Sequence, residues 1–301
     1  MNSRSFRARL RREKPEAARR ITSVSVRDAP AGSVSAVWGS PFLDAHAAYL
    51  RHLGTAAVAE VVDADGVYAV RTGVASNSEN GALSGAVDAA DARRLVAWFA
   101  DARLPASWLV GDVQAAPVLE AVGCTPERSA VEMRGPVPEL PPGGSVDVAV
   151  DAVADESALE AWLEVAGACG WFESEEERRT ARELYASIGL GVSAPLRLRL
   201  ARDGDAPVGM AAAFHTGRTV LLTAVGVLPS ARRRGIGRAL ALARLRDARD
   251  RGCDSAVLAP SPDGAALYRS LGFETRPQPP DRWFYLPAPT MQPSGQPGKI
   301  G

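Results

Sequence analysis

The stretch that decides the fold reads Val225-Gly-Val-Leu-Pro-Ser-Ala-Arg-Arg-Arg-Gly-Ile-Gly-Arg-Ala-Leu240. An apolar β run over residues 219–227 ends here, and after a short loop two glycines open a helix that extends to about residue 251. The first N–H groups of a helix have no internal partners and lie at the positive end of its dipole. This segment therefore predicts an anion site, to which four arginines add forked phosphate donors. These arginines are Arg232, Arg233, Arg234 and Arg238.

The glycine pattern suits a pyrophosphate but does not name the ligand. Gly235 and Gly237 lack a Cβ, so a phosphate oxygen can approach the backbone closely. A dinucleotide fingerprint would need a third glycine where Leu240 stands, and the loop has no lysine for a Walker motif. The alternative interpretation is a solvent-exposed arginine patch beside an ordinary helix start.

Composition limits the class of protein. A chain of 301 residues suits two domains of about 150 residues. The 35 Lys+Arg balance 35 Asp+Glu, which argues against a dedicated nucleic-acid binder. No apolar run approaches the roughly 20 residues of a membrane helix. Three scattered cysteines and three histidines predict a reducing, cytoplasmic location and no metal site.

Proline and glycine punctuation divides the chain. The segment Gly135-Pro-Val-Pro-Glu-Leu-Pro-Pro-Gly-Gly144 predicts a linker over 136–145, between one domain at 21–135 and another at 146–287. Residues 1–20 hold eight basic side chains with no apolar stretch after them, so they predict a disordered basic arm rather than a secretory signal. Residues 288–301, rich in Pro, Gly and Gln, predict a disordered tail.

The second half predicts a mixed order of elements. Strands are expected at 146–150, 196–201, 208–214 and 256–259, and helices at 155–166, 175–188 and 264–271. Ser174 with Glu177 has capping-box spacing. The first half predicts helices at 90–101 and 115–122 and strands at 67–72, 107–110 and 131–134. The fold class expected is mixed α/β, a mostly antiparallel sheet with helices on both faces.

The two halves share a weak internal echo. Residues 108–110 and 118–124 parallel residues 257–259 and 267–273, both at an offset of 149. A constant offset over two elements indicates a duplication.

At this point the residues resemble a known family. Arg232-x-x-Gly235-x-Gly237, preceded by Val227-x-Pro229, looks like the coenzyme A motif of the GNAT superfamily of N-acetyltransferases. Residues 267–273, Leu-Tyr-Arg-Ser-Leu-Gly-Phe, look like that family's tyrosine-bearing closing helix. The resemblance covers about residues 146–287. It implies an enzyme with acetyl-CoA as co-substrate, in which a primary amine attacks the thioester directly, and two GNAT-like domains in tandem.

The resemblance also implies roles for individual residues. Backbone at 225–227 would line the pantetheine arm and stabilise an oxyanion, amides of 233–238 would hold the pyrophosphate, and Tyr268 would protonate the leaving thiolate. Ser261 stands where many relatives carry asparagine, so its contact to the pantetheine arm would be smaller. A core aromatic is the alternative for Tyr268. The acetyl-CoA residues expected are Val225, Gly226, Val227, Arg232, Arg233, Arg234, Gly235, Ile236, Gly237, Arg238, Ala239 and Ser261.

The acceptor side is poorly defined. Trp171, Glu173 and His215 are candidates for binding a small-molecule or peptide amine, and no general base is identifiable among Glu173, Glu175 and His215. No membrane or nucleic-acid partner is expected, and the oligomeric state stays open. At the 149 offset the first half lacks the paired glycines and has Leu119 in place of Tyr268. It is therefore expected not to bind acetyl-CoA but to wall one side of the acceptor site.

Two rival functions remain open. A non-catalytic acyl-CoA sensor or interaction module would keep the anion site and lack turnover. A nucleic-acid binder would use residues 232–234 with the basic arm, although the zero net charge disfavours it.

Overall fold

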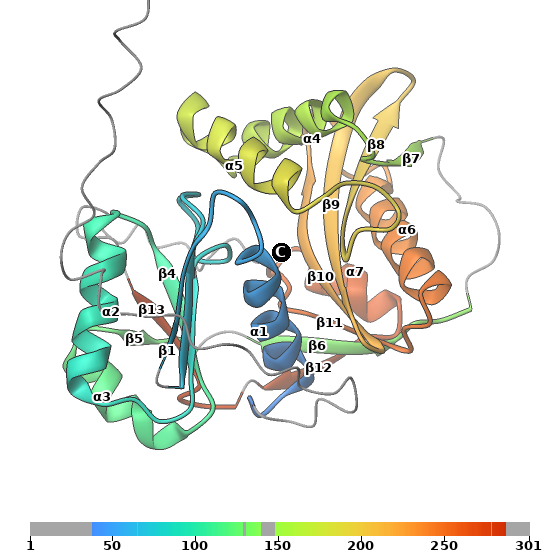
Figure 1. Ribbon diagram of the computed structural model, residues 1–301. Coiled ribbons are helices and arrows are strands. Elements are labelled where there is room, and N and C mark those ends of the chain that lie inside the picture. Colours follow the sequence, from blue (N-terminus) through green and yellow to red (C-terminus); the bar gives the residue numbers. More distant parts are fainter. Residues whose placement is uncertain (1–37, 65, 129–130, 140–147, 278, 287–301) are drawn as a thin grey trace, which may run out of the picture.

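The strands and helices of this computed structural model assemble into two mixed α/β units (Figure 1). The structure describes residues 38–64, 66–128, 131–139, 148–277 and 279–286. The predicted arm at 1–20, the tail at 288–301 and most of the predicted linker at 136–145 lie outside the described residues.

The first half of the chain supplies three α-helices, one short 3-10 helix (labelled η) and six strands among the residues described. Their order and bounds are α1 (Pro41–Leu53), β1 (Glu60–Ala64), β2 (Val67–Arg71), β3 (Gly81–Ser84), α2 (Ala89–Asp101), β4 (Ala106–Val110), η2 (Val113–Ala115), α3 (Ala116–Ala121), β5 (Thr125–Pro126) and β6 (Val131–Pro136).

The second half supplies the elements of the glycine-arginine segment. Their order and bounds are β7 (Ala149–Ala152), α4 (Glu156–Ala168), α5 (Glu175–Ser187), β8 (Leu196–Asp203), β9 (Ala206–Thr216), β10 (Thr219–Val227), η3 (Pro229–Ala231), α6 (Ile236–Asp250), β11 (Ser255–Leu258), α7 (Ala265–Ser270), β12 (Glu274–Pro277) and β13 (Trp283–Leu286). The capping box is confirmed, because Ser174 Oγ accepts from Glu177 N at 3.1 Å at the start of α5.

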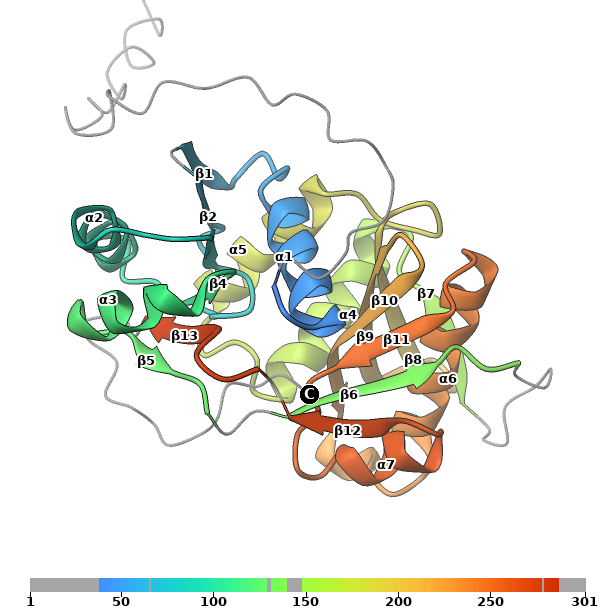
Figure 2. The ribbon, with the colours of Figure 1, turned by 90° about the horizontal axis from the view of Figure 1, so that it is seen from below.

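The two units exchange one strand each. The first sheet has the order β1-β2-β3-β4-β13-β5, so β13 from the end of the chain lies between two strands of the first half. The second sheet has the order β12-β6-β11-β10-β9-β8-β7, so β6 from the first half lies between β11 and β12. The boundary predicted between residues 135 and 146 therefore does not separate the two sheets, because each sheet contains one strand from the other half of the chain (Figure 2).

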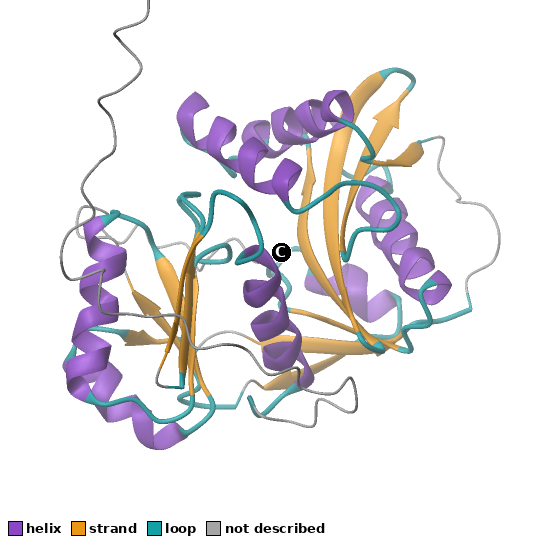
Figure 3. Ribbon diagram, in the orientation of Figure 1, coloured by secondary structure: helices purple, strands orange, loops and turns teal. Residues whose placement is uncertain are grey.

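The helices and the two sheets form five layers, and α1 lies in the middle layer. α2 and α3 cover the outer face of the first sheet, and α6 and α7 cover the outer face of the second (Figure 3). Between the sheets, α1 packs against β9, β10 and β11, beside α4 and α5. Ser40 begins α1 by accepting from Leu43 N at 3.2 Å, and Ser40 Oγ donates to Glu132 Oε2 at 2.6 Å on the exchanged β6. The mixed α/β fold class, with helices on both faces, is confirmed.

The internal echo extends to whole elements. Helices α3 and α7 begin at 116 and 265 and end at 121 and 270, and β5 and β12 begin at 125 and 274. Each of these pairs differs by 149 residues. The exchanged strands β6 and β13 occupy equivalent places in the two sheets. The arrangement is that of two copies of one unit that have traded their last strands.

The exchange makes a stability prediction. Phe284, on β13, is fully buried and pairs with Trp108 on one side and Pro126 on the other. Replacing Phe284 with alanine is expected to lower the free energy of unfolding by about 3–5 kcal/mol. Hydrogen exchange should then show lost protection in β4 and β5, 150 residues or more away in sequence. Lost protection confined to the second sheet would contradict the exchange.

Candidate functional site

The two central strands of the second sheet separate beyond Leu221. β10 and β11 are paired in parallel only at Thr219–Ser255, Val220–Ala256 and Leu221–Val257, although β10 continues to Val227. On the other side, the register with β9 shifts between Thr223 and Val225. Ala224, with φ +35°, is the extra residue of this bulge. The bulge turns β10 away from β11 and leaves backbone groups without a strand partner.

The loop after β10 leads into an uncapped helix. Arg233 has φ +67° and Gly235 has φ +81°, two left-handed residues that turn the chain into α6. Gly235 is the N-cap and provides no side-chain hydrogen bond to the first turn. A Cβ added at Gly237 would lie 3.8 Å from Leu267 Cδ2, so packing does not demand glycine there. The first turn of α6 is therefore open to an anion.

The four arginines differ in how they are held. Arg232 Nε donates to the Val227 carbonyl at 3.2 Å, and Arg234 pairs with Asp203 at 2.9 Å. Arg238 Nη1 donates to Ser270 Oγ at 3.1 Å. Arg233 has no hydrogen bond or ion pair to any described residue. All four side chains belong to exposed residues, so their positive charge surrounds the start of α6.

Tyr268 is buried against a buried arginine that the sequence did not suggest. Arg244, on α6, is fully buried, and its Nη2 donates to the Tyr268 hydroxyl at 2.7 Å. Its Nη1 donates to the carbonyls of Ala212 at 3.1 Å and Thr223 at 2.9 Å, on the two strands that flank the bulge. Tyr268 also packs edge-on against Phe273, with ring centroids 5.5 Å apart.

This guanidinium has no counter-charge in the described part of the chain. Arg244 forms no ion pair with a described carboxylate, and its Nε has no hydrogen-bond partner. An unpaired buried charge is costly, and such groups concentrate at functional sites. Arg244 therefore brings a fixed positive charge under the separated strands and beside the Tyr268 hydroxyl.

The equivalent place in the first unit is closed. β3 and β4 stay paired over all four residues of β3, and β2–β3 has no register shift. Asp88 caps α2, and its Oδ1 accepts from Ala90 N and Asp91 N at 2.8 Å each. These bonds lower the pKa of the Asp88 carboxyl. A carboxylate thus already occupies the first turn, where an anion would have to bind.

The same comparison applies to the arginine–tyrosine pair. At the offset of 149, Arg244 corresponds to Leu95 and Tyr268 to Leu119, and both leucines are buried in one apolar cluster. The first unit therefore lacks both members of the pair together.

The other expected site residues are placed as follows. Ser261 Oγ accepts from Gly264 N at 3.2 Å and so caps the turn before α7. Trp171 packs at the edge of the cluster between the sheets, and the exposed Glu173 donates its N–H to Glu177 Oε2 at 2.7 Å. His215 pairs with Val220, four residues before the bulge, and is not brought to the separated strands. Burial lowers the pKa of His215 to about 4, and its Nδ1 lies 3.0 Å from the Pro195 carbonyl.

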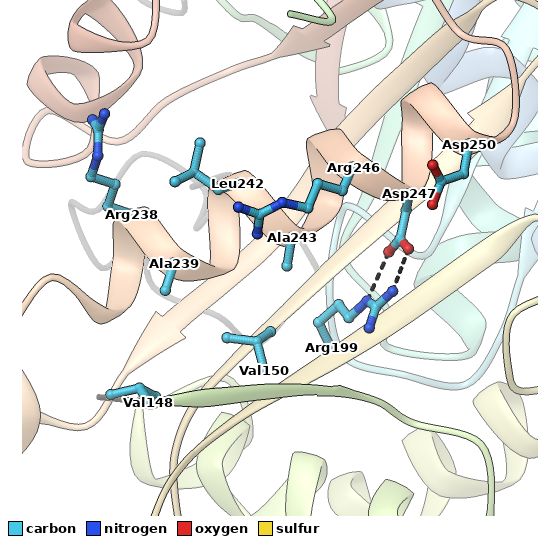
Figure 4. A pocket seen from close by; sticks show the side chains of 10 residues that line it. All are labelled: Val148, Val150, Arg199, Arg238, Ala239, Leu242, Ala243, Arg246, Asp247 and Asp250. Atoms are coloured by element: carbon cyan, nitrogen blue, oxygen red, sulfur yellow. Dashed lines mark hydrogen bonds and ion pairs between the residues drawn. The ribbon is translucent and has the colours of Figure 1, made fainter. Parts of the chain in front are cut away.

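A pocket of about 340 Å³ lies on the opposite side of α6 from Tyr268. Its walls are α6 and the β7–β8 edge, with Val148 and Val150 on one side (Figure 4). Arg199 Nε donates to Asp247 Oδ2 at 2.7 Å inside it, and Arg197 Nη1 donates to Asp247 Oδ1 at 3.0 Å, so two arginines share this carboxylate. Arg238 and Ala239 border this pocket, and Arg238 points away from the Arg199–Asp247 pair.

Two further searches of the described residues complete the survey. No group of three or more His, Cys, Asp or Glu side chains in the described ranges could hold a metal ion. No helix in those ranges combines the length and the apolar character needed to cross a membrane.

Comparisons with known proteins bear on the family of the second unit and on the fold. The model of the Acetyltransferase (GNAT) family matches residues 159–273. No curated protein matches the chain. A GCN5-related N-acetyltransferase from Kribbella flavida superposes with a TM-score of 0.58 at 23% identity, over 84% of this chain and 97% of that one. That likeness covers both units and supports the fold.

Two further solved structures have lower TM-scores. A conserved protein of unknown function from Staphylococcus epidermidis ATCC 12228 has a TM-score of 0.49 and 13% identity, over 75% of this chain and 92% of that chain. An aminoglycoside N-acetyltransferase in complex with CoA has a TM-score of 0.36 and 22% identity, over 45% of this chain and 92% of that one.

The glycine-arginine segment and the uncapped start of α6 lie inside the stretch that the family model matches. Residues 159–273 match the model of that acetyltransferase family. That family transfers acetyl groups from acetyl-CoA, and the resemblance noted in the glycine-arginine segment is confirmed.

Proposed function

We propose that the second unit transfers the acetyl group of acetyl-CoA to a primary amine. The observation that carries the proposal is the uncapped first turn of α6 directly after the separated end of β10. The pyrophosphate would bind the amides of residues 233–238, with Arg232, Arg233 and Arg234 around it. The pantetheine arm would run between β10 and β11 along Val225, Gly226 and Val227.

The chemistry follows from the groups beside the bulge. The amine nitrogen, in its neutral form, attacks the thioester carbon and loses a proton to solvent. The negative charge on the carbonyl oxygen meets unpartnered N–H groups of β10. When the C–S bond breaks, Tyr268 donates its proton to the leaving sulfur. The Arg244 guanidinium, 2.7 Å from that hydroxyl, then stabilises the negative charge left on the phenol oxygen. Ser261 contributes by holding the turn before α7, which carries Tyr268.

A non-catalytic acyl-CoA sensor is the second candidate function. It would retain the anion site, and it fits the core packing of Tyr268 against Phe273. The buried Arg244 beside Tyr268 favours the enzyme, because a sensor gains nothing from an unpaired buried charge at the sulfur end of the ligand.

A cysteine beside the proposed pantetheine path offers a direct test. The Cys169 Sγ lies 3.0 Å from the point where a Cβ at Gly226 would stand. Burial raises the pKa of this half-buried thiol, and nearby Arg232 lowers it. We expect acetyl-CoA to slow modification of Cys169 by N-ethylmaleimide, measured by peptide mass spectrometry. Cys124, on the first unit, should be unaffected. Equal modification rates at Cys169 with and without acetyl-CoA would contradict the path along β10.

A further inference from the structure

One buried guanidinium connects three separate parts of the proposed site. Arg244 Nη1 donates to the Ala212 carbonyl on β9 at 3.1 Å and to the Thr223 carbonyl on β10 at 2.9 Å. Arg244 Nη2 donates to the Tyr268 hydroxyl on α7 at 2.7 Å. Arg244 itself belongs to α6, the helix that begins at the anion site. A single planar group therefore links β9, β10 and α7 to α6.

The two carbonyls that Arg244 binds lie at the edge of the bulge. Ala212 and Thr223 form the last pair before the β9–β10 ladder shifts by one residue at Ala224. Ala224 has φ +35°, a left-handed conformation that is costly for a residue with a Cβ. Such a conformation persists only where surrounding contacts hold it in place. The two hydrogen bonds from the guanidinium to the neighbouring pair are contacts of this kind.

The first unit shows the same place in the fold without the arginine. Its strands β2, β3 and β4 have the places that β9, β10 and β11 have in the second sheet. β2 and β3 pair with no register shift, and β3 and β4 stay paired along all four residues of β3. At the offset of 149, Arg244 corresponds to the buried Leu95. Arginine, bulge and strand separation thus occur together in one unit, and the described strands of the other have none of them.

The partners of Arg244 indicate what the residue is for. A regular sheet satisfies its carbonyls with N–H groups of neighbouring strands and needs no side chain to do so. Here two of the three partners are strand carbonyls, and no described carboxylate pairs with the charge. An arginine suits three acceptors that must keep one fixed arrangement, because its fork presents five donors in rigid geometry.

We propose that Arg244 is a positioning residue that keeps β10 separated from β11 and holds the Tyr268 hydroxyl beside the separated end. The guanidinium would act on the reaction through two groups: the N–H groups of β10 that meet the oxyanion, and the phenol that donates the proton. This inference rests on the proposed function. It adds to that function a role for Arg244 at the bulge that does not depend on Tyr268.

Variants of the full-length protein separate this role from simpler ones. Arg244→Met keeps the length of the side chain and removes every donor, whereas Arg244→Lys keeps the charge without the planar fork. Arg244→Met removes a buried charge that has no described counter-ion, so we expect it to fold, and melting curves check this. Leu95→Ala is the control, because Leu95 is the buried counterpart of Arg244 in the first unit and its truncation lowers stability there.

Hydrogen exchange tests the hold on the bulge without any acceptor. Deuterium uptake is followed by peptide mass spectrometry at residues 210–213 and 222–226, which flank the register shift. We expect these amides to exchange at least about tenfold faster in Arg244→Met than in the wild type, under conditions in which both are folded. Arg244→Lys should also exchange faster, and it decides the test if Arg244→Met does not fold. Leu95→Ala should lose protection in the first sheet only. Wild-type exchange around the bulge in the Arg244 variants would overturn the proposal.

Turnover separates a role at the bulge from a role at Tyr268 alone. Thiol release from acetyl-CoA is measured with spermidine, tyramine and kanamycin, and the amine that reacts fastest is used for every variant. Arg244→Met should lower kcat by about 100-fold or more, while the KM for acetyl-CoA rises by less than about tenfold, because the pyrophosphate site at α6 is intact. Arg244→Lys should keep less than about a tenth of the wild-type kcat. A wild-type kcat in Arg244→Lys would show that the charge alone is needed and would overturn the proposal.

The double variant gives the sharpest comparison. In the Tyr268→Phe background the proton donor is already missing, so any further effect of Arg244→Met arises elsewhere. We expect Arg244→Met to lower the remaining kcat by about tenfold or more. No further loss in this background would show that Arg244 serves only Tyr268, and it would overturn the role at the bulge.

The two proposals fail in different ways. If the wild type does not bind acetyl-CoA in a calorimetric titration, the proposed function fails, whereas hydrogen exchange still decides whether Arg244 holds the bulge. If acetyl-CoA binds and Arg244→Met has wild-type exchange and kcat, only the role of Arg244 is overturned.

Discussion

Substituting Gly237 with glutamate is expected to weaken acetyl-CoA binding by more than about 100-fold. The new carboxylate would stand at the first turn of α6, take the N–H groups meant for the pyrophosphate and repel its charge. Asp88 shows this arrangement in the first unit, where its carboxylate already accepts from two first-turn N–H groups of α2. The effect is to be measured by calorimetric titration.

The substitution at Gly237 should act on the ligand rather than on the fold. A Cβ at this position meets only Leu267 Cδ2, at 3.8 Å. Arg249→Gln is the matched control: it changes the net charge by the same one unit, at the far end of α6. It should bind acetyl-CoA as the wild type does. Unimpaired binding in Gly237→Glu would place the anion site elsewhere.

Replacing Tyr268 with phenylalanine is expected to lower kcat by about 100-fold or more while leaving the KM for acetyl-CoA unchanged. The ring would still pack on Phe273, but the proton donor for the leaving sulfur would be gone. The variant should also lose about 1–3 kcal/mol of stability, because Arg244 Nη2 is left without its partner. Thiol release and chemical denaturation measure the two effects separately.

The two effects distinguish an enzyme from a sensor. Tyr285→Phe serves as the control, since it deletes another half-buried phenol hydroxyl, on β13 of the other sheet. Its kcat should stay within about twofold of the wild type. A Tyr268→Phe variant that loses stability but keeps its kcat would assign Tyr268 to the core and favour the sensor.

The glycine-arginine segment could be interpreted from sequence because its signals are local. The end of β10, the turn and the start of α6 each depend on neighbouring residues, and their predicted bounds agree with the structure to within one residue. α1 gave no such signal. Ala45, His46 and Ala47 point to different sides of it and all are buried, because this helix lies between two sheets. Arg51 is the one exposed residue of α1, so the polar face that would reveal the helical period is narrow.

Long-range features were not predictable in the same way. The sequences of short strands such as β6 and β13 do not indicate which sheet they join, so the exchange became visible only in the structure. Arg244, within an arginine-rich helix, has the sequence context of a surface residue. The comparison with Leu95 at the 149 offset was the one available signal of its unusual role.

The first unit contributes to the structure of the second unit, although its own anion site is closed. Its own anion site is closed by Asp88, and its counterpart of the arginine–tyrosine pair is two leucines. Its α1 nevertheless packs on β9, β10 and β11, and its strand β6 completes the second sheet. Gly135 on β6 allows the Phe273 ring to approach within 2.7 Å of where a Cβ would stand, and Phe273 in turn packs on Tyr268. The unit without an open site thus shapes the one that has it.

The central claim is that one anion site, at the start of α6, binds acetyl-CoA. Calorimetric titration of acetyl-CoA into the full-length protein tests it most directly. We expect saturable binding at one site per chain, abolished in Gly237→Glu. Two sites would mean that Asp88 does not close the first unit, and no binding would contradict the function proposed for the second.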